Sequence, residues 1–376
     1  MIKKILFVLP HFGLGGTSSS LKNFLDVVCN KYDISIFSLS EQGESKFYFT
    51  TNNILPSISY LDLWHSNYKE FNSIKKIEVF SLKLIKRFCY FFSIDFEVLL
   101  YRLAAKNNIF RNYHTIIAFQ EGSPTKFVSY LNCNIRIAWV HSNLKYSNIK
   151  TDNYISIYNK FNKVICVSKY TTQIFKELFP VNNVDFIYNV INWNSLIKDS
   201  QISDPHLLSF KDDYLIVSIG RINPIKQFYL IPSIAKRVHS KITNIKWLII
   251  GDGDTFNSEQ IRQEIKKNNC EDFVLLTGYK ANVAPFLKRA DLYVCTSESE
   301  ACPMVFLEAN ALNTFVITNN FPSSYELLNK QTGLITTLDN LSDAIIDFFS
   351  NGPIAPMYNN QFFNESISKF ESLLSR

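Results

Sequence analysis

The chain has 376 residues, 47% of them hydrophobic, and a formal net charge of only +6. Such a length and composition provide for two ordinary domains with large cores and exclude wholesale disorder. The mild positive charge suits anionic ligands or an acidic membrane surface. With no zinc-finger spacing and no RNA-recognition signature, it argues against a nucleic-acid-binding protein.

The amino terminus, MIKKILFVLP, has the basic start and short apolar run of a signal peptide. The run is only about six residues, however, and glycines rather than a cleavage site follow it. We therefore predict a buried first strand, with a signal peptide as the alternative. No apolar stretch approaches 20 residues, so no transmembrane helix is predicted. The seven cysteines form no CxxC pair, which favours reduced thiols in a cytoplasm and no disulfide framework.

Short, continuously apolar runs alternate with helical patterns, as expected for parallel strands buried on both faces. A first series of predicted strands comprises Ile5 to Leu9, Ile34 to Leu39, Thr115 to Phe119, Ile135 to Val140 and Lys163 to Val167. A second series comprises Tyr214 to Ile219, Lys246 to Ile250, Phe273 to Leu276, Leu292 to Cys295 and Thr314 to Thr318.

Two such series predict an α/β protein with two doubly wound, Rossmann-like domains that face each other across a cleft. The polar stretch from Asn189 to Pro205 marks the transition between them. The expected organisation is a first Rossmann-like domain over residues 1–193 and a second one over residues 194–356. An amphipathic helix within 357–376 is expected to pack back on the first domain.

The first predicted strand runs into a glycine loop, GLGGT, in which Gly15, Gly16 and Thr17 would bring backbone N–H groups close to a phosphate. A plain β-to-α turn is the alternative reading. The glycines are too closely spaced for Gly-x-Gly-x-x-Gly, which disfavours a dinucleotide-dependent dehydrogenase. Further on, His141 ends the strand of WVHS, where its side chain is expected to meet a sugar hydroxyl or merely to satisfy local backbone.

The second series opens with VSIGRINPIKQ, in which Gly220 permits a tight turn and Arg221 and Lys226 follow. Cations at the carboxyl end of the first strand of a doubly wound domain point into the ligand crevice, where they would neutralise a diphosphate. The alternative is two ordinary surface cations. Gly251 and Gly278 end the next two strands, and with Tyr279 they suggest a pocket for the base.

The segment Ala290 to Leu312 carries two carboxylates, Glu300 and Glu308, around a strand-to-helix junction. We place Pro303 in the first turn of the helix, whose free N–H groups and positive dipole end favour a phosphate. Glu300 in the loop would bind a sugar hydroxyl, and Glu308 on the helix would bind a ribose.

Together these motifs resemble family four of the retaining glycosyltransferases, which have the two-domain GT-B fold. The resemblance spans most of the chain. It covers GLGGT, WVHS, the VS pair Val167-Ser168, YNV, GRINPIK, IIGDG, LTGY, the Glu-x7-Glu segment and the FPSSYELL and TGLI runs. Two departures are Ala301, where the family often has glycine, and Val190, where it often has proline. Ala301 leaves the identity of the donor sugar open.

The resemblance implies which residues act. Arg221 and Lys226 would bind the donor diphosphate, Glu308 the ribose, and Glu300 the donor-sugar hydroxyls, while His141 would lie beside the transferring sugar. The other implied donor contacts are Gly15, Gly16, Thr17, Asn189, Gly220, Gly251, Gly278, Tyr279 and the backbone of Cys302, Pro303, Met304 and Val305. No DxD-type metal site accompanies them, so no metal and no other cofactor is expected.

The segment Lys75 to Phe92 mixes cations with apolar residues, of which Ile77, Phe80, Leu84 and Phe88 fall at helical spacing. Such a helix suits peripheral contact with an anionic membrane. In the alternative reading it covers the first domain, with its apolar stripe in the core and its lysines in water.

We expect a retaining, metal-independent hexosyltransferase that moves a hexose or N-acetylhexosamine from a nucleotide diphosphate, by default UDP, to a glycan acceptor. The acceptor is expected to be polyprenyl-diphosphate-linked, in bacterial capsule, O-antigen or exopolysaccharide assembly, and the protein cytoplasmic or peripheral on the inner face of the plasma membrane. The alternative enzyme is a sugar-nucleotide epimerase or hydrolase on a similar frame. A non-catalytic nucleotide-binding module is the alternative outside the enzymes.

Overall fold

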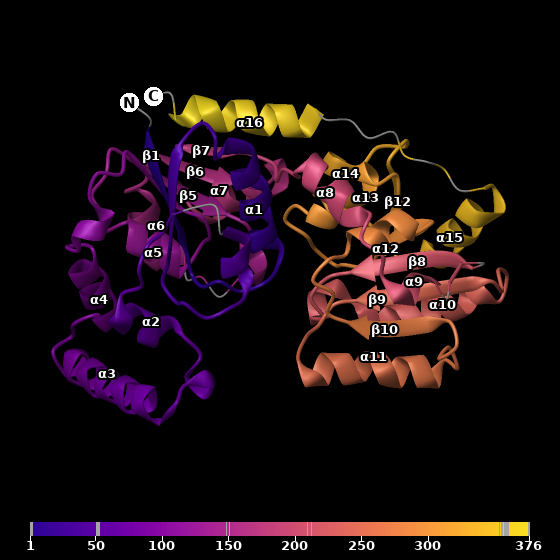
Figure 1. Cartoon of the computed structure of the whole chain (residues 1–376), viewed down its shortest axis with the longest axis horizontal. Coiled ribbons are helices and arrows are strands. Elements are labelled where there is room, and N and C mark those ends of the chain that lie inside the picture. Colours follow the sequence, from indigo (N-terminus) through magenta and orange to yellow (C-terminus); the bar gives the residue numbers. More distant parts are fainter. Residues whose placement is uncertain are drawn as a thin grey trace. The chain divides into compact units, whose positions relative to one another are not determined.

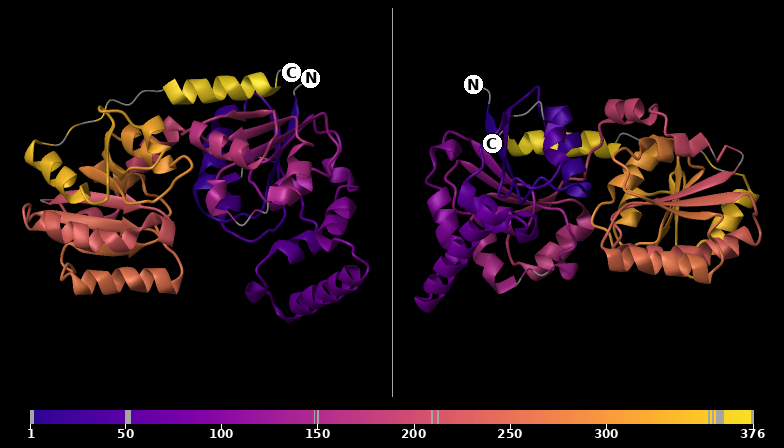
Figure 2. Two further views of the ribbon diagram at one scale, coloured as in Figure 1. Left: turned by 180° about the vertical axis from the view of Figure 1, so that it is seen from behind. Right: turned by 60° about the horizontal axis from the view of Figure 1, so that its bottom comes forward.

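The computed structural model describes residues 3–49, 53–147, 149, 151–208, 210–211, 213–352, 354, 356 and 361–374. The chain divides into two compact units. Met1–Tyr188 and Ser366–Arg376 form the first, and Asn189–Glu365 forms the second. Each unit has one parallel sheet with helices on both faces (Figures 1 and 2). The predicted α/β class with two doubly wound domains is confirmed.

The first unit has a seven-stranded sheet of order β3-β2-β1-β4-β5-β6-β7. Its strands are β1 (Lys4–Leu9), β2 (Asp33–Ser38), β3 (Asn53–Ile54), β4 (Thr115–Ala118), β5 (Ile135–Val140), β6 (Lys163–Cys166) and β7 (Val184–Phe186). Its helices are α1 (Gly16–Val28), α2 (Ser59–His65), α3 (Ser73–Phe91), α4 (Phe96–Ala104), α5 (Ser123–Val128), α6 (Thr151–Tyr158) and α7 (Lys169–Leu178). Because β1 pairs in parallel with both β2 and β4, the amino terminus is a buried strand, as predicted.

The last helix, α16 (Gln361–Leu374), is joined to the first unit through its residues beyond 365. Phe370 is buried edge-on against Phe24 of α1, with ring centroids 4.5 Å apart. The Lys369 ammonium lies 3.4 Å from the ring centroid of Phe186 in β7. The predicted carboxyl-terminal segment, 357–376, also includes residues 357–360, 375 and 376, which lie outside the described ranges.

The second unit has a six-stranded sheet of order β10-β9-β8-β11-β12-β13. Its strands are β8 (Tyr214–Ile219), β9 (Ile245–Ile250), β10 (Val274–Gly278), β11 (Leu292–Cys295), β12 (Phe315–Asn319) and β13 (Gly333–Thr336). Its helices are α8 (Trp193–Ser200), α9 (Pro205–Leu208), α10 (Ile231–His239), α11 (Thr255–Lys267), α12 (Ala284–Arg289), α13 (Met304–Ala311), α14 (Ser324–Leu327) and α15 (Leu341–Ser350).

Two differences from the sequence reading concern this unit. The polar stretch that we read as the transition between domains contains α8, which the Asn192 side chain caps by accepting from the N–H of Ser195 at 3.2 Å. Pro303 is not in the first turn of its helix. It is the N-cap, with ψ of 110°, and the helix begins at Met304. Pro303 lies outside the helix because the capping residue precedes the first helical dihedral angles by one position.

Candidate active site

In each sheet the strand order reverses at one point. In the second unit the reversal falls between β8 and β11, and in the first unit between β1 and β4. Ligands of doubly wound sheets bind outside the carboxyl ends of the strands at such a point. The loop after β8 carries Gly220, Arg221 and Lys226, and the loop after β11 carries Glu300. The sequence-predicted residues thus flank the switch point of the second unit.

Lys226 and Glu300 form an ion pair there. Their side chains are 21% and 15% exposed, so the pair is largely withdrawn from water. Burial, the largest single influence, lowers the pKa of the Lys226 ammonium, but the charge of Glu300, the nearby Cys295 and the hydrogen bond to Glu300 together outweigh it, so the pKa is raised. Lys226 is therefore a permanent cation, held beside a carboxylate that the sequence analysis had assigned to a different part of the substrate.

Hydrogen bonds from several loops fix this pair. The Ser297 hydroxyl donates to the Glu300 carboxylate at 2.8 Å, and the Ser323 hydroxyl donates to the Glu300 carbonyl at 2.7 Å. On the lysine side, Asn223 caps the short turn and accepts from the Lys226 N–H at 3.1 Å. The Thr296 hydroxyl donates to the Lys226 carbonyl at 2.7 Å. The sequence analysis missed these four polar residues, although all of them lie in the loops at the ends of β8, β11 and β12.

The glycine turns at this edge are in backbone contact. A Cβ on Gly251 would lie 1.9 Å from the carbonyl oxygen of Gly220, so only glycine fits at position 251. The Ile222 N–H donates to the Asp252 carbonyl at 2.8 Å, so the two loops are joined through their backbones. A Cβ on Gly220 would lie 3.0 Å from the Cε of Lys226. The absence of a side chain at Gly220 therefore makes room for the lysine.

The remaining predicted donor contacts of the second unit also lie at these strand ends. Gly278 is the last residue of β10, with a φ of +75°, and Tyr279 after it is 47% exposed. Cys302, Pro303 and Met304 are buried and Val305 is half-buried, at the start of α13. The Asn189 amide donates to the carbonyl of Cys302 at 3.1 Å and so supports that turn. Arg221 is exposed directly after β8.

Glu308 lies one turn into α13 and is half-buried. Within the part of the chain that the structure describes, its carboxylate has no hydrogen bond or ion pair. Loss of hydration raises the pKa of this carboxyl to about 7. A carboxylate without compensation is costly and is characteristic of a binding or catalytic site.

In the first unit, Gly15 is the N-cap of α1, and Gly16 and Thr17 begin its first turn. A side chain on Gly16 would meet nothing within 4 Å, so the backbone at this helix start is open to close approach. This loop follows β1, at the switch point of the first sheet.

His141 follows β5 and packs against aromatic rings, with its centroid 4.4 Å from that of Phe119 and 6.1 Å from that of Trp139. Burial lowers the pKa of the imidazole to about 3, so the ring is neutral. Its Nε2 is buried with no hydrogen-bond partner among the described residues. Orphaned buried polar atoms are rare in native proteins and often mark function.

The sequence analysis overlooked Glu121, which holds the loop that carries His141. Its carboxylate accepts from the N–H of His141 at 2.8 Å and from the hydroxyl of Ser142. Glu121 follows β4, across the switch point from the glycine loop. The sequence contains a signal that could have revealed Glu121, because an acidic residue followed by a glycine stands just after a predicted strand.

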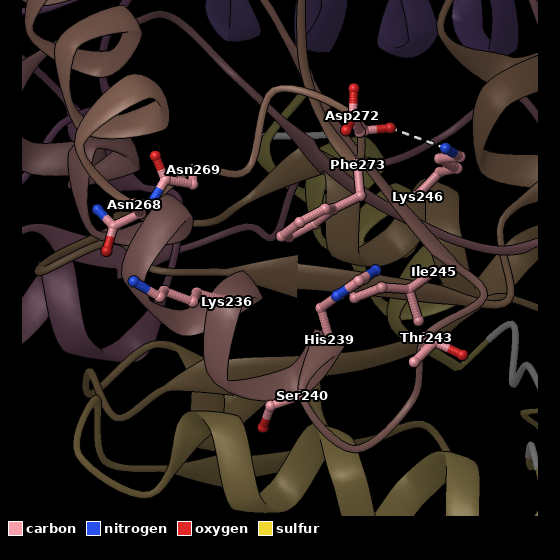
Figure 3. Close-up of a pocket in the computed structure, with 10 residues that line it drawn as sticks. All are labelled: Lys236, His239, Ser240, Thr243, Ile245, Lys246, Asn268, Asn269, Asp272 and Phe273. Atoms are coloured by element: carbon pink, nitrogen blue, oxygen red, sulfur yellow. Dashed lines mark hydrogen bonds between the residues drawn. The ribbon is translucent and has the colours of Figure 1, made fainter.

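A hollow of about 460 Å³ lies elsewhere in the second unit (Figure 3). Among its lining residues are Ile245, the first residue of β9, and His239, which stacks on Phe273 at 4.0 Å. It is therefore at the amino end of the sheet, opposite the switch-point loops, and is not the candidate site. No group of three or more His, Cys, Asp or Glu side chains in the described ranges is placed to hold a metal ion.

Comparisons with known proteins identify what the chain is similar to. Residues 199–362 match the family model "Glycosyl transferases group 1". An uncharacterized glycosyltransferase of Methanocaldococcus jannaschii is 28% identical over 54% of this chain, and the match spans only half of that relative's length. A Campylobacter jejuni relative is 20% identical over 90% of this chain and 87% of its own. Its name is N-acetylgalactosamine-N,N'-diacetylbacillosaminyl-diphospho-undecaprenol 4-alpha-N-acetylgalactosaminyltransferase.

Among solved structures, Anabaena HepE in complex with UDP and glucose covers all of both chains, with a TM-score of 0.75 and 16% identity. At that identity the likeness shows the fold. Residues 199–362 are therefore similar to the group 1 glycosyl transferases, and the fold of the two Rossmann-like units matches that of solved GT-B structures.

Proposed function

We propose that the chain is a retaining glycosyltransferase that takes a hexose or N-acetylhexosamine from a nucleotide-diphosphate sugar. The observation that carries this proposal is the Lys226–Glu300 pair at the switch point of the second unit. A lysine held permanently charged suits a diphosphate, and a carboxylate beside it suits sugar hydroxyls. The epimerase or hydrolase alternative is not favoured, because the similar proteins are named as transferases.

In the proposed reaction the donor's bond between sugar and phosphate oxygen breaks, and the acceptor hydroxyl attacks the anomeric carbon from the same face. The departing phosphate takes the proton of that hydroxyl, so no side-chain base is needed. Lys226 and Arg221 stabilise the negative charge that develops on the diphosphate, and on this basis we propose that no metal cofactor is required. Glu308 accepts hydrogen bonds from the ribose. Gly15, Gly16, Thr17 and His141 keep the roles that the family resemblance implies.

The default donor base is uracil, supported by UDP in the HepE structure. A lipid-linked glycan acceptor is supported by the undecaprenol-linked substrate in the name of the Campylobacter relative. We place the reaction in the assembly of a bacterial surface polysaccharide, at the cytoplasmic side of the membrane. Within the described ranges, no helix combines the length and apolar character that a bilayer crossing requires.

A thermal-shift panel of nucleotide sugars tests the donor class, and a UDP-sugar is expected to raise the melting temperature most. NMR of the product from the preferred donor and a polyprenyl-diphosphate-linked glycan then reads the anomeric configuration, which is expected to match the donor. Inversion would refute the retaining mechanism. Full activity after dialysis against EDTA is expected, and loss that Mg²⁺ or Mn²⁺ restores would refute metal independence.

The assignment of Glu300 is tested by Glu300→Ala, with Glu298→Ala as the matched control on the same loop. Glu298 is exposed and donates its backbone N–H to Ile225, which alanine retains. We expect a large loss of turnover only for the Glu300 variant, with circular dichroism unchanged for both. Wild-type rates for Glu300→Ala would remove the proposed site.

A further inference from the structure

Helix α3 of the first unit differs from an ordinary surface helix because its apolar residues, and not only its cations, are exposed. The residues in the predicted apolar stripe point away from the core: Ile77, Phe80, Leu84 and Phe88 are 67%, 59%, 53% and 66% exposed. Ile74, which precedes the predicted segment, is 69% exposed. At the end of the helix, Tyr90, Phe91 and Phe92 are 84%, 81% and 54% exposed. This finding contradicts the reading in which the apolar stripe lies in the core, although Lys75, Lys83 and Lys86 are exposed as that reading expects.

The side of α3 that faces the unit is narrow. Val79 and Cys89 are buried, and partly buried Leu82 packs on the core beside them. The helix contacts α2 and α4 and lies at the periphery of the unit (Figures 1 and 2). A packed side of this size holds the helix in place and leaves the opposite side uncovered.

The lysines of α3 turn back toward the unit. The Lys83 ammonium lies 4.6 Å from the ring centroid of Tyr68, that of Lys86 lies 5.0 Å from Trp64, and that of Lys75 lies 5.4 Å from Phe71. Lys75 nevertheless remains about half exposed. The cations therefore stand behind the apolar face and beside it rather than within it.

From this arrangement we propose that the outer face of α3 binds an anionic phospholipid bilayer, with the helix lying in the plane of the surface. A helix that lies in a membrane interface buries its apolar face among the acyl chains and keeps its cations at the headgroups. The helix carries five cations and a single acid, Glu78, so its charge complements anionic headgroups. Six charged residues in 19 rule out a span and leave a surface position.

The same charge disfavours a second copy of the chain on this face. Two α3 helices packed face to face would bring ten cations together with only two acids, and like charges at such an interface are destabilising. A contiguous exposed apolar face marks an interaction site.

The proposal does not depend on the transfer reaction, and its test uses neither donor nor acceptor. The full chain is sedimented with vesicles of phosphatidylethanolamine and phosphatidylglycerol, and with vesicles of phosphatidylcholine alone. We expect binding to the anionic vesicles to be at least tenfold stronger. The variant Phe80→Ser/Leu84→Ser/Phe88→Ser removes exposed side chains only, so the fold is retained and binding to both vesicle types is expected to be lost.

A second variant, Lys83→Glu/Lys86→Glu/Arg87→Glu, is expected to lose at least tenfold in affinity for the anionic vesicles, since each cation near such a surface contributes about fivefold. The matched control is Arg262→Glu/Lys266→Glu/Lys267→Glu on the exposed side of α11, which makes the same change in net charge and is expected to bind nearly as the wild type.

Three outcomes would overturn the proposal. One is a wild-type chain that does not sediment with anionic vesicles, and another is an α3 variant that binds as well as the wild type. The third is a wild-type chain that forms a dimer in lipid-free analytical ultracentrifugation which the serine variant abolishes, because the face would then serve a second copy. Transfer activity toward a water-soluble acceptor is expected to be unchanged in both α3 variants, so failure here is distinguishable from failure of the proposed enzyme.

Discussion

Replacing Glu308 by glutamine gives a sharp test of the ribose site. Burial raises the pKa of this carboxyl from 4.5 to about 7, a shift that corresponds to roughly 3 kcal/mol against the ionised form. If ribose hydroxyls donate to the carboxylate, they stabilise that form and return the pKa toward its ordinary value. Nucleotide binding must then become stronger as pH rises through 7, because binding selects the ionised protein.

The expected size follows from the same pKa. With a value of about 7 in the free protein, roughly 3% of the molecules are ionised at pH 5.5 and roughly three quarters at pH 7.5, so UDP affinity is expected to rise about 25-fold. Isothermal titration calorimetry across this range measures it, and buffers of different ionisation enthalpy count the proton released. UDP titrates in the same range, so the comparison is with Glu308→Gln, which retains the shape and is expected to bind more weakly. Equal pH profiles for the two proteins would refute the reasoning.

The pH dependence of the free protein's stability tests the pKa of Glu308 independently of nucleotide binding. The folded-state pKa lies above the unfolded value, so the folded protein holds the proton more tightly between about pH 4.5 and 7. Stability therefore falls as pH rises through this window, and the full penalty is present above it. Glu308→Gln is expected to raise the melting temperature at pH 8 and to have little effect at pH 4.5. A gain at pH 4.5 as large as that at pH 8 would exclude titration as the cause.

Three further predictions concern the switch-point loops. Lys226→Ala is expected to weaken UDP binding, measured by calorimetry, by about 1.5–3 kcal/mol, the contribution of a charge-assisted hydrogen bond. The control is Lys236→Ala at the hollow of Figure 3, which is expected to leave UDP affinity unchanged. Glu300→Gln is expected to tighten UDP binding while turnover falls, because the amide no longer neutralises Lys226, and weaker binding would contradict that. Gly251→Ala is expected to destabilise the chain by several kcal/mol, since its Cβ would lie 1.9 Å from a carbonyl oxygen. The control in thermal unfolding is Gly16→Ala, whose Cβ would have no atom within 4 Å. Equal melting temperatures for the two variants would disprove the backbone contact at Gly251.

The sequence predicted nine central strands and the edge strand β10, because each of them is a continuous apolar run, and the observed ends lie within two residues of the predicted ones. It missed β3, β7 and β13, which lie at sheet edges. β3 has only two residues and β7 contains a central Asp185, since an edge strand pairs on one side and needs little hydrophobicity.

The sequence predicted which residues belong to the site, but it did not predict which of their side chains contact each other. Glycines at strand ends and the spacing of Glu300 and Glu308 are visible in the chain, whereas Lys226 and Glu300 are 74 residues apart and meet only because β8 and β11 are neighbours. For α3 the helical period was evident, but which side of the helix faces the core depends on what α2 and α4 present to it. Periodicity alone does not contain that information.

In the proposed transfer reaction, the carboxylate of Glu300 has a consequence for product release. After transfer, the nucleoside diphosphate left behind is more anionic than the donor was, and an unopposed lysine would retain it. Because Glu300 already serves as a counter-ion for Lys226, it competes with the spent nucleotide for the ammonium group. We expect this competition to limit product inhibition, so that the enzyme exchanges its by-product for fresh donor without an external trigger.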